Sequence, residues 1–96
     1  MTNKERFFKM ANDAIQRVKE ELKKNRSERV DKASDKQLNY IINRIFYMQE
    51  MVKNNTVPPK ERRYDEIGHI VIDEWPLPSK LGHLLIELEN FYIKYL

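Results

Sequence analysis

The sequence predicts an all-α protein that folds as a single domain, an antiparallel bundle of four helices spanning residues 1–96. Apolar residues recur at steps of three and four along most of the chain, which is the spacing of amphipathic helices. Two of these stretches follow a capping-box sequence, which is a signature of a helix N-terminus. The connections between the stretches are short, and short connections favour antiparallel neighbours.

The first helix is expected over residues 3–25. Thr2 is followed three positions later by Glu5, which is the capping-box pattern. One face of the stretch then carries apolar residues at helical spacing, namely Phe7, Ala11, Ala14, Val18 and Leu22. Basic residues crowd the expected last turn, where the helix dipole favours cations.

The second helix is expected over residues 35–54. Ser34 and Gln37 form another capping-box pair. The apolar face that follows consists of Leu38, Ile41, Ile45, Met48 and Val52. Pro58 and Pro59 cannot continue the backbone hydrogen-bond ladder, so the helix should end before them.

The third helix is expected over residues 59–74. Pro59 suits the first position of a helix, and an apolar stripe follows at Tyr64, Ile67, Val71 and Trp75. Gly68 weakens a helix by about 1 kcal/mol relative to alanine, and residues 70–72 are all β-branched. A short strand at 69–74 is therefore the alternative.

The fourth helix is expected over residues 79–96. Pro76 should end the preceding element, and Pro78 with Ser79 should begin this one. Its apolar stripe consists of Leu81, Leu84, Leu85, Leu88, Phe91, Tyr92 and Tyr95.

The last two helices are expected to pack as a hairpin, because residues 67–74 are echoed by residues 81–88. Each segment carries one glycine and one histidine at matching positions. A glycine allows close approach of a partner helix. We therefore expect Gly68 to face Leu85 and Gly82 to face Val71.

The composition excludes several classes of protein. The chain has no cysteine, which excludes disulfides and thiol chemistry. No apolar run reaches transmembrane length, and the charged N-terminus does not resemble a signal peptide. We expect a soluble cytoplasmic protein without membrane contact. Abundant lysine, asparagine and isoleucine are typical of proteins from AT-rich bacterial or phage genomes.

The two histidines are candidates for metal ligands. Glu66 with His69, and His83 with Glu87, have the carboxylate–histidine spacings that helical bundles use for metals. At about 100° per residue, however, both histidines point away from the apolar stripes. The sequence therefore predicts no metal site. It also contains no glycine-rich loop and no nucleophile–base pairing, so we expect no cofactor, no small-molecule substrate and no catalytic residues.

The second helix carries a surplus face that is expected to bind a partner. Tyr40, Arg44, Tyr47 and Met51 lie roughly opposite its apolar stripe, and these residue types are enriched at protein interfaces. The cover is either another helix of the chain, a protein partner or a second copy in a homodimer. Trp75, in the proline-rich turn, either caps the core or is presented as a binding anchor.

The function that these features favour is that of a small non-enzymatic protein-binding module. The size of the chain and its surplus interface fit a bacterial or phage accessory factor, such as an immunity protein, an antitoxin or an inhibitor. Small helical bacteriocin-immunity proteins are similar to the chain in size and architecture.

Two further functions are alternatives. Residues 1–63 carry a net positive charge and residues 64–96 a net negative one. The first alternative is a nucleic-acid-binding regulator that contacts phosphates with Lys19, Lys23, Lys24, Arg26 and Arg29. The second rests on Arg63 and His69, whose spacing resembles the Arg–His motif of HEPN-type RNases. That resemblance implies a helical RNase.

Overall fold

A computed structural model describes residues 1–29, 32–75 and 79–96 of the chain. These residues form helices and no strand, so the all-α prediction is confirmed and residues 69–74 do not adopt the alternative strand. The helices, with two short 3-10 turns between them, are α1 (Asn3–Leu22), η1 (Arg26–Glu28), α2 (Asp35–Lys53), η3 (Lys60–Arg62), α3 (Glu66–His69), its π-helical continuation η4 (Ile70–Glu74), and α4 (Lys80–Tyr95). None of the described helices combines the length and apolar character that crossing a bilayer requires.

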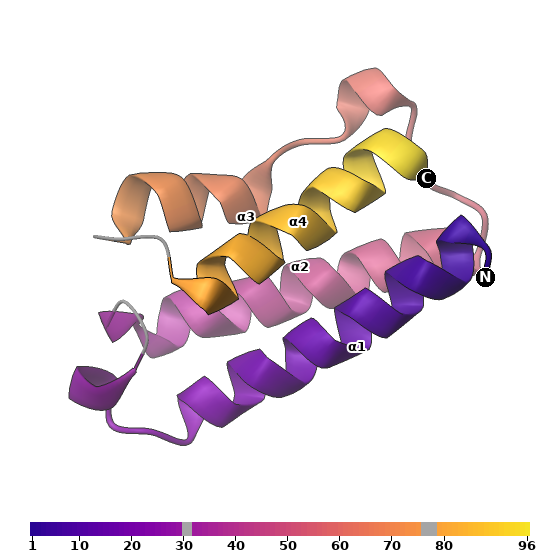
Figure 1. Ribbon diagram of the computed structural model, residues 1–96. Helices are drawn as coiled ribbons and strands as arrows, with labels where there is room; N and C mark the ends of the chain where they lie inside the picture. Colours follow the sequence, from indigo (N-terminus) through magenta and orange to yellow (C-terminus); the bar gives the residue numbers. More distant parts are fainter. Residues whose placement is uncertain (30–31, 76–78) are drawn as a thin grey trace.

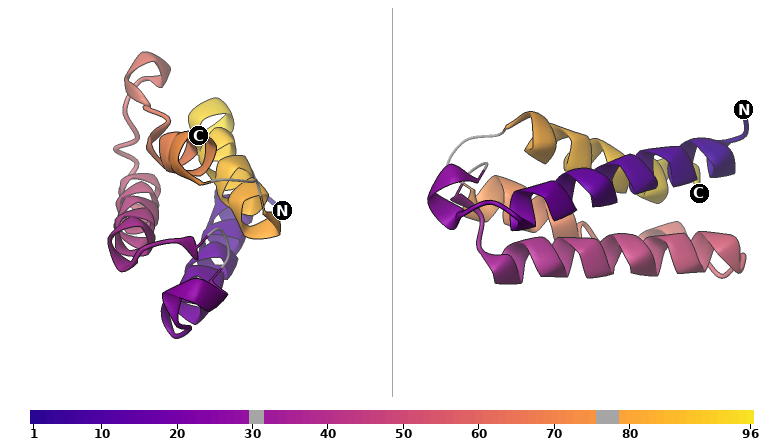
Figure 2. Two further views of the ribbon diagram at one scale, coloured as in Figure 1. Left: turned by 90° about the vertical axis from the view of Figure 1, so that its left-hand side faces the viewer. Right: turned by 90° about the horizontal axis from the view of Figure 1, so that it is seen from below.

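The helices pack as an antiparallel bundle that measures 39 × 23 × 20 Å (Figure 1). Helix α1 contacts both α2 and α4, and the shorter α3 packs against α4 and α2 on the other side. Figure 2 shows that α2 runs along most of the molecule with α1 and α4 lying lengthwise beside it, whereas α3 and η4 accompany only one part. One end of the bundle therefore lacks a full fourth layer.

The helix starts follow the local sequence. Thr2 Oγ1 accepts from the Glu5 N–H at 3.1 Å, and Ser34 Oγ accepts from the Gln37 N–H at 3.1 Å, so both predicted capping boxes form. Ser79 caps α4 in the same way. Helix α1 ends at Leu22, three residues before the predicted boundary.

Helix α2 ends ahead of its prolines through local backbone geometry. Asn55 has a left-handed φ of 57°, and the Thr56 N–H donates to the Met51 carbonyl at 2.9 Å. This is the 6→1 hydrogen bond of a Schellman motif, which satisfies a carbonyl at the end of a helix.

A single apolar core joins the helices and contains the predicted inward residues of α1 and α2. It also contains those of α4 except Tyr95, which was expected on the inward stripe but is 60% exposed. Trp75 is only 5% exposed, and its Nε1 donates to Gln37 Oε1 at 3.2 Å. Trp75 therefore has the core position that was one of its two expected roles, and its indole N–H is already bonded within the protein. The predicted break at Pro76 and Pro78 lies outside the described residues.

The third helix differs most from its prediction. It starts at Glu66 rather than at Pro59, and the chain between them forms only the turn η3 and extended backbone at Arg63. Tyr64, which was expected on the inward stripe, is 67% exposed, whereas Ile67 and Val71 are buried as predicted. The Arg63 guanidinium donates to the carbonyls of Tyr92 and Ile93 at the end of α4. Arg63 therefore contacts α4 from an extended segment and not from a helix.

The two glycines have different packing roles. A Cβ on Gly82 would lie 3.0 Å from Val71 Cγ1, which confirms the predicted close approach. A Cβ on Gly68 would instead collide with the carboxylate of Asp65 in the same turn. The atoms closest to Gly68 therefore belong to a carboxyl group of the same turn, whereas the prediction placed Leu85 there.

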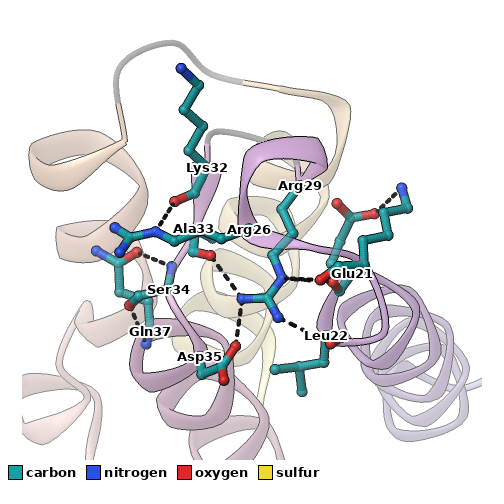
Figure 3. A network of polar contacts seen from close by, with 10 residues as sticks. Glu21, Leu22, Arg26, Arg29, Lys32, Ala33, Ser34, Asp35 and Gln37 are labelled. Carbon is teal, nitrogen blue, oxygen red and sulfur yellow. Dashed lines mark hydrogen bonds and ion pairs between the residues drawn. The ribbon is translucent and has the colours of Figure 1, made fainter.

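Arg29 ties the end of α1 to the start of α2 (Figure 3). Its guanidinium donates to the carbonyls of Glu21, Leu22 and Ala33 at 2.9–3.1 Å and pairs with the Asp35 carboxylate. The last carbonyls of a helix have no partner within the helix. Arg29 supplies these donors from the loop, and its side chain is only 7% exposed.

We expect Arg29→Ala to lower the free energy of unfolding by about 2–3 kcal/mol, because it leaves several poorly solvated carbonyls unpaired. Chemical denaturation followed by circular dichroism measures this change. Lys23→Ala, at an exposed neighbouring position, is the control and should change stability little. Equal stability of the two variants would contradict a structural role for Arg29.

Candidate functional site

A buried carboxyl group organises the contact between α3 and α4. Glu89 of α4 has no exposed surface. Its oxygens accept the N–H of Ile67 at 2.9 and 3.1 Å and the N–H of Gly68 at 3.0 Å. These N–H groups belong to the first turn of α3 and have no carbonyl partner within that helix. Glu89 therefore acts as the N-terminal cap of a helix distant in sequence.

Arg44 of α2 completes this buried cluster. Its Nε lies 3.3 Å from Glu89 Oε2 and 3.2 Å from Glu66 Oε2, and its Nη2 donates to the Tyr64 carbonyl at 3.0 Å. The guanidinium also lies over the rings of Tyr47 and Tyr92. With 9% of its side chain exposed, Arg44 holds α2, α3 and α4 together.

The pKa of Glu89 is raised from its ordinary value of 4.5 to about 7. Burial is the largest cause, since it disfavours the charged form. The neighbouring carboxyl group of Asp65 also raises the pKa, because a second carboxyl group disfavours the charged form of Glu89. The N–H groups of Ile67 and Gly68, together with Arg44, oppose the shift.

A hollow of about 360 Å³ opens beside this cluster, and we call it the tyrosine hollow. It lies between α2, the end of α4 and the segment that joins α2 to α3. The lining residues are Tyr40, Asn43, Arg44, Tyr47, Pro58, Arg62, Arg63, Tyr64, Glu66 and Tyr92.

The predicted partner-binding residues divide between the hollow and the interior. Tyr40 and Tyr47 are 46% and 44% exposed and line the hollow. Arg44 lines it too, but its charge is paired with two glutamates. Met51 is half-buried outside the hollow, next to the Thr56 hydroxyl. With Trp75 in the core, the accessible part of the predicted set is the tyrosine pair.

Sequence reasoning missed Glu89 and Arg62 as site residues. Glu89 had a detectable signal, because it follows Leu85 by four positions and precedes Tyr92 by three, within an otherwise apolar stripe. Arg62 had no such signal. Only the course of the chain after Pro59 brings it to the hollow.

The histidines face outward, as their helical phase predicts. His69 and His83 are both exposed, and His69 Nδ1 lies 3.3 Å from Asp73 Oδ2. Across residues 1–29, 32–75 and 79–96 no three potential ligands gather where they could hold a metal ion. Arg63 lines the tyrosine hollow and His69 lines a neighbouring one, so the two residues of the RNase-like spacing do not share a pocket in the described part of the chain.

Several basic residues near the end of α1 already make hydrogen bonds or ion pairs within the protein. Arg29 is buried in its carbonyl contacts, Arg26 Nε donates to the Lys32 carbonyl, and Lys24 pairs with Glu21 at 2.7 Å. A separate hollow nevertheless collects basic side chains, including Lys23, Lys24, Arg26 and Lys36.

No protein-family model matches the chain, and no curated protein is significantly similar to it. By its own features the protein is an all-α antiparallel bundle with a buried Arg–Glu cluster and an adjoining tyrosine-lined hollow.

We expect the stability of the wild-type protein to fall, relative to Glu89→Gln, as pH rises from about 4.5 to about 7. In this window the folded state retains a proton on Glu89 that the unfolded state has released, so raising the pH favours unfolding. A shift of this size corresponds to up to about 3 kcal/mol. Denaturation curves recorded across the window measure it.

The control for this experiment is Glu87→Gln, which changes an exposed residue of the same helix. Its stability should follow the pH dependence of the wild type. A Glu89→Gln variant that also follows the wild type would contradict the raised pKa.

Proposed function

We propose that this protein is a small non-enzymatic binding module, and that another protein chain docks over the tyrosine hollow. The observation that supports this most is the concave site itself, in which partly exposed tyrosines surround an immobilised arginine. Tyrosine and arginine are the residue types that dominate binding hot spots, particularly in pockets.

The rigidity of the site also supports the proposal. Tyr40 and Tyr47 project from α2, whose opposite face is anchored in the core by Ile41, Ile45 and Met48. The side chain of Arg44 is held by its ion pairs with Glu66 and Glu89. A preorganised site loses little conformational entropy when it binds.

Within this proposal, the biological role is that of a bacterial or phage accessory factor, such as an immunity protein, an antitoxin or an inhibitor. The small size, the composition and the lack of a predicted catalytic group support this role. The partner is either the protein that the factor neutralises or a second copy of the chain.

The double variant Tyr40→Ser with Tyr47→Ser tests the docking surface. Because both rings are about half exposed, we expect a stability loss well below the about 3–5 kcal/mol that truncating a buried aromatic residue costs. Self-association, measured by sedimentation velocity, or binding to the product of a neighbouring gene, measured by calorimetry, should be lost.

A matched control is the double variant Phe46→Ser with Tyr95→Ser, which removes exposed aromatic side chains outside the hollow. It should retain the association. If both double variants associate like the wild type, the tyrosine hollow is not the docking surface.

Nucleic-acid binding is the second candidate function, and the basic hollow at the end of α1 favours it. We expect any such binding to weaken steeply with salt, because each phosphate contact releases counterions. Fluorescence anisotropy with a labelled duplex of mixed sequence measures this. Lys23→Gln with Lys36→Gln should reduce both the affinity and the salt slope. Binding that is insensitive to salt and to these substitutions would contradict the candidate.

A further inference from the structure

We propose that the tyrosine hollow is a carboxylate-binding pocket, in which Arg62 and the hydroxyl group of Tyr92 hold one carboxylate of the partner. The inference rests on the proposed function in assigning the ligand to a partner protein chain. It adds the chemical group that the partner must present and the two residues that recognise it.

The charge of the lining residues selects an anion. Three arginines and one glutamate line the hollow. Arg44 is paired with Glu66 and Glu89, and the guanidinium of Arg63 is bonded to the carbonyls of Pro58, Tyr92 and Ile93. Within the described part of the chain, the side chain of Arg62 makes no hydrogen bond or ion pair, and it is exposed. Arg62 is thus the cation available to a ligand.

The number of available charges favours a carboxylate over a dianion. One guanidinium matches one carboxylate, which it can bind through two parallel hydrogen bonds. Glu66 on the same wall would repel the second charge of a phosphate group.

An unsatisfied donor points to the same ligand. The Tyr92 hydroxyl is buried and has no hydrogen-bond partner among the described residues. Such a group costs about 1–3 kcal/mol, and most buried polar groups avoid this by pairing. Tyr92 lines the hollow, and the guanidinium groups of Arg44 and Arg63 lie over its ring. A carboxylate oxygen supplies the acceptor that this hydroxyl lacks.

The walls fit an apolar stem that carries the carboxylate. Tyr40, Tyr47, Tyr64 and Pro58 surround the polar groups. The volume of about 360 Å³ accommodates one large side chain or one chain terminus, and not an extended peptide.

The first experiment uses small probes with the full chain. Phenylacetate is titrated into the ¹⁵N-labelled protein at neutral pH and followed by heteronuclear NMR, with phenylacetamide as its uncharged match. We expect saturable shifts at residues 60–64 and around Tyr92 with phenylacetate, and binding at least about tenfold weaker with the amide, because the charge-assisted hydrogen bonds are lost. Equal binding of the two probes, or no binding of phenylacetate at the hollow, would overturn the inference.

Variants then test the two recognising residues. Arg62→Gln should weaken phenylacetate binding by about tenfold, whereas Lys60→Gln, in the same turn but outside the hollow, should not. Tyr92→Phe should also weaken binding while leaving the melting temperature unchanged or higher, because it deletes an unpaired buried hydroxyl group. If Arg62→Gln binds like Lys60→Gln, the inference fails. It also fails if Tyr92→Phe retains full affinity.

A carboxylate can come from an acidic side chain or from a chain terminus, and two blocked amino acids distinguish these sources. N-acetylphenylalanine presents a terminal carboxylate, and the methylamide of N-acetylglutamate presents a side-chain carboxylate. Tighter binding of either one supports the inference and identifies the source, and binding of neither overturns it. Failure of these probes leaves the docking proposal standing, because the tyrosine double variant tests that proposal independently.

Discussion

The buried carboxyl group of Glu89 is the interaction on which the rest of this structure depends. It lies on α4 but caps α3, since it accepts the otherwise unpaired N–H groups of Ile67 and Gly68. A buried carboxyl group is unfavourable unless it is hydrogen-bonded or paired, and Arg44 provides the pairing. Removing one member of such a cluster leaves the others buried without partners, so α2, α3 and α4 are held together as a unit.

This capping arrangement also explains why the molecule has a hollow. Glu89 caps α3 at Glu66, and Arg63 binds the carbonyls at the end of α4. The chain between Pro59 and Asp65 therefore runs back past the end of α4 as a short turn and an extended segment (Figure 1). The tyrosines of α2 line the hollow together with residues of this segment. The incomplete layer leaves them around a concave surface, and concave surfaces with a few fixed polar groups are where proteins commonly bind ligands.

The arginines show that a count of basic residues overstates the charge available for binding. Arg29, Arg44 and Arg63 direct their guanidinium groups at carbonyls or carboxylates of the protein itself. The planar guanidinium group suits this work, because it presents several donors in a fixed geometry. Consequently the nucleic-acid alternative depends on fewer residues than the sequence suggests, and the anion-binding capacity of the tyrosine hollow depends on Arg62.

The sequence by itself determined the fold class, both capping boxes, the core faces of α1, α2 and α4, the outward direction of the histidines and the approach of Gly82 to Val71. All of these follow from helical periodicity and from interactions within a few residues. Only the tertiary structure decided where α3 begins, because its cap is a carboxylate more than 20 positions away along the chain. It also decided which arginines are buried and that Tyr40 and Tyr47 border a hollow. These features depend on contacts between segments distant in sequence, and no local pattern in a single sequence specifies which segments will meet.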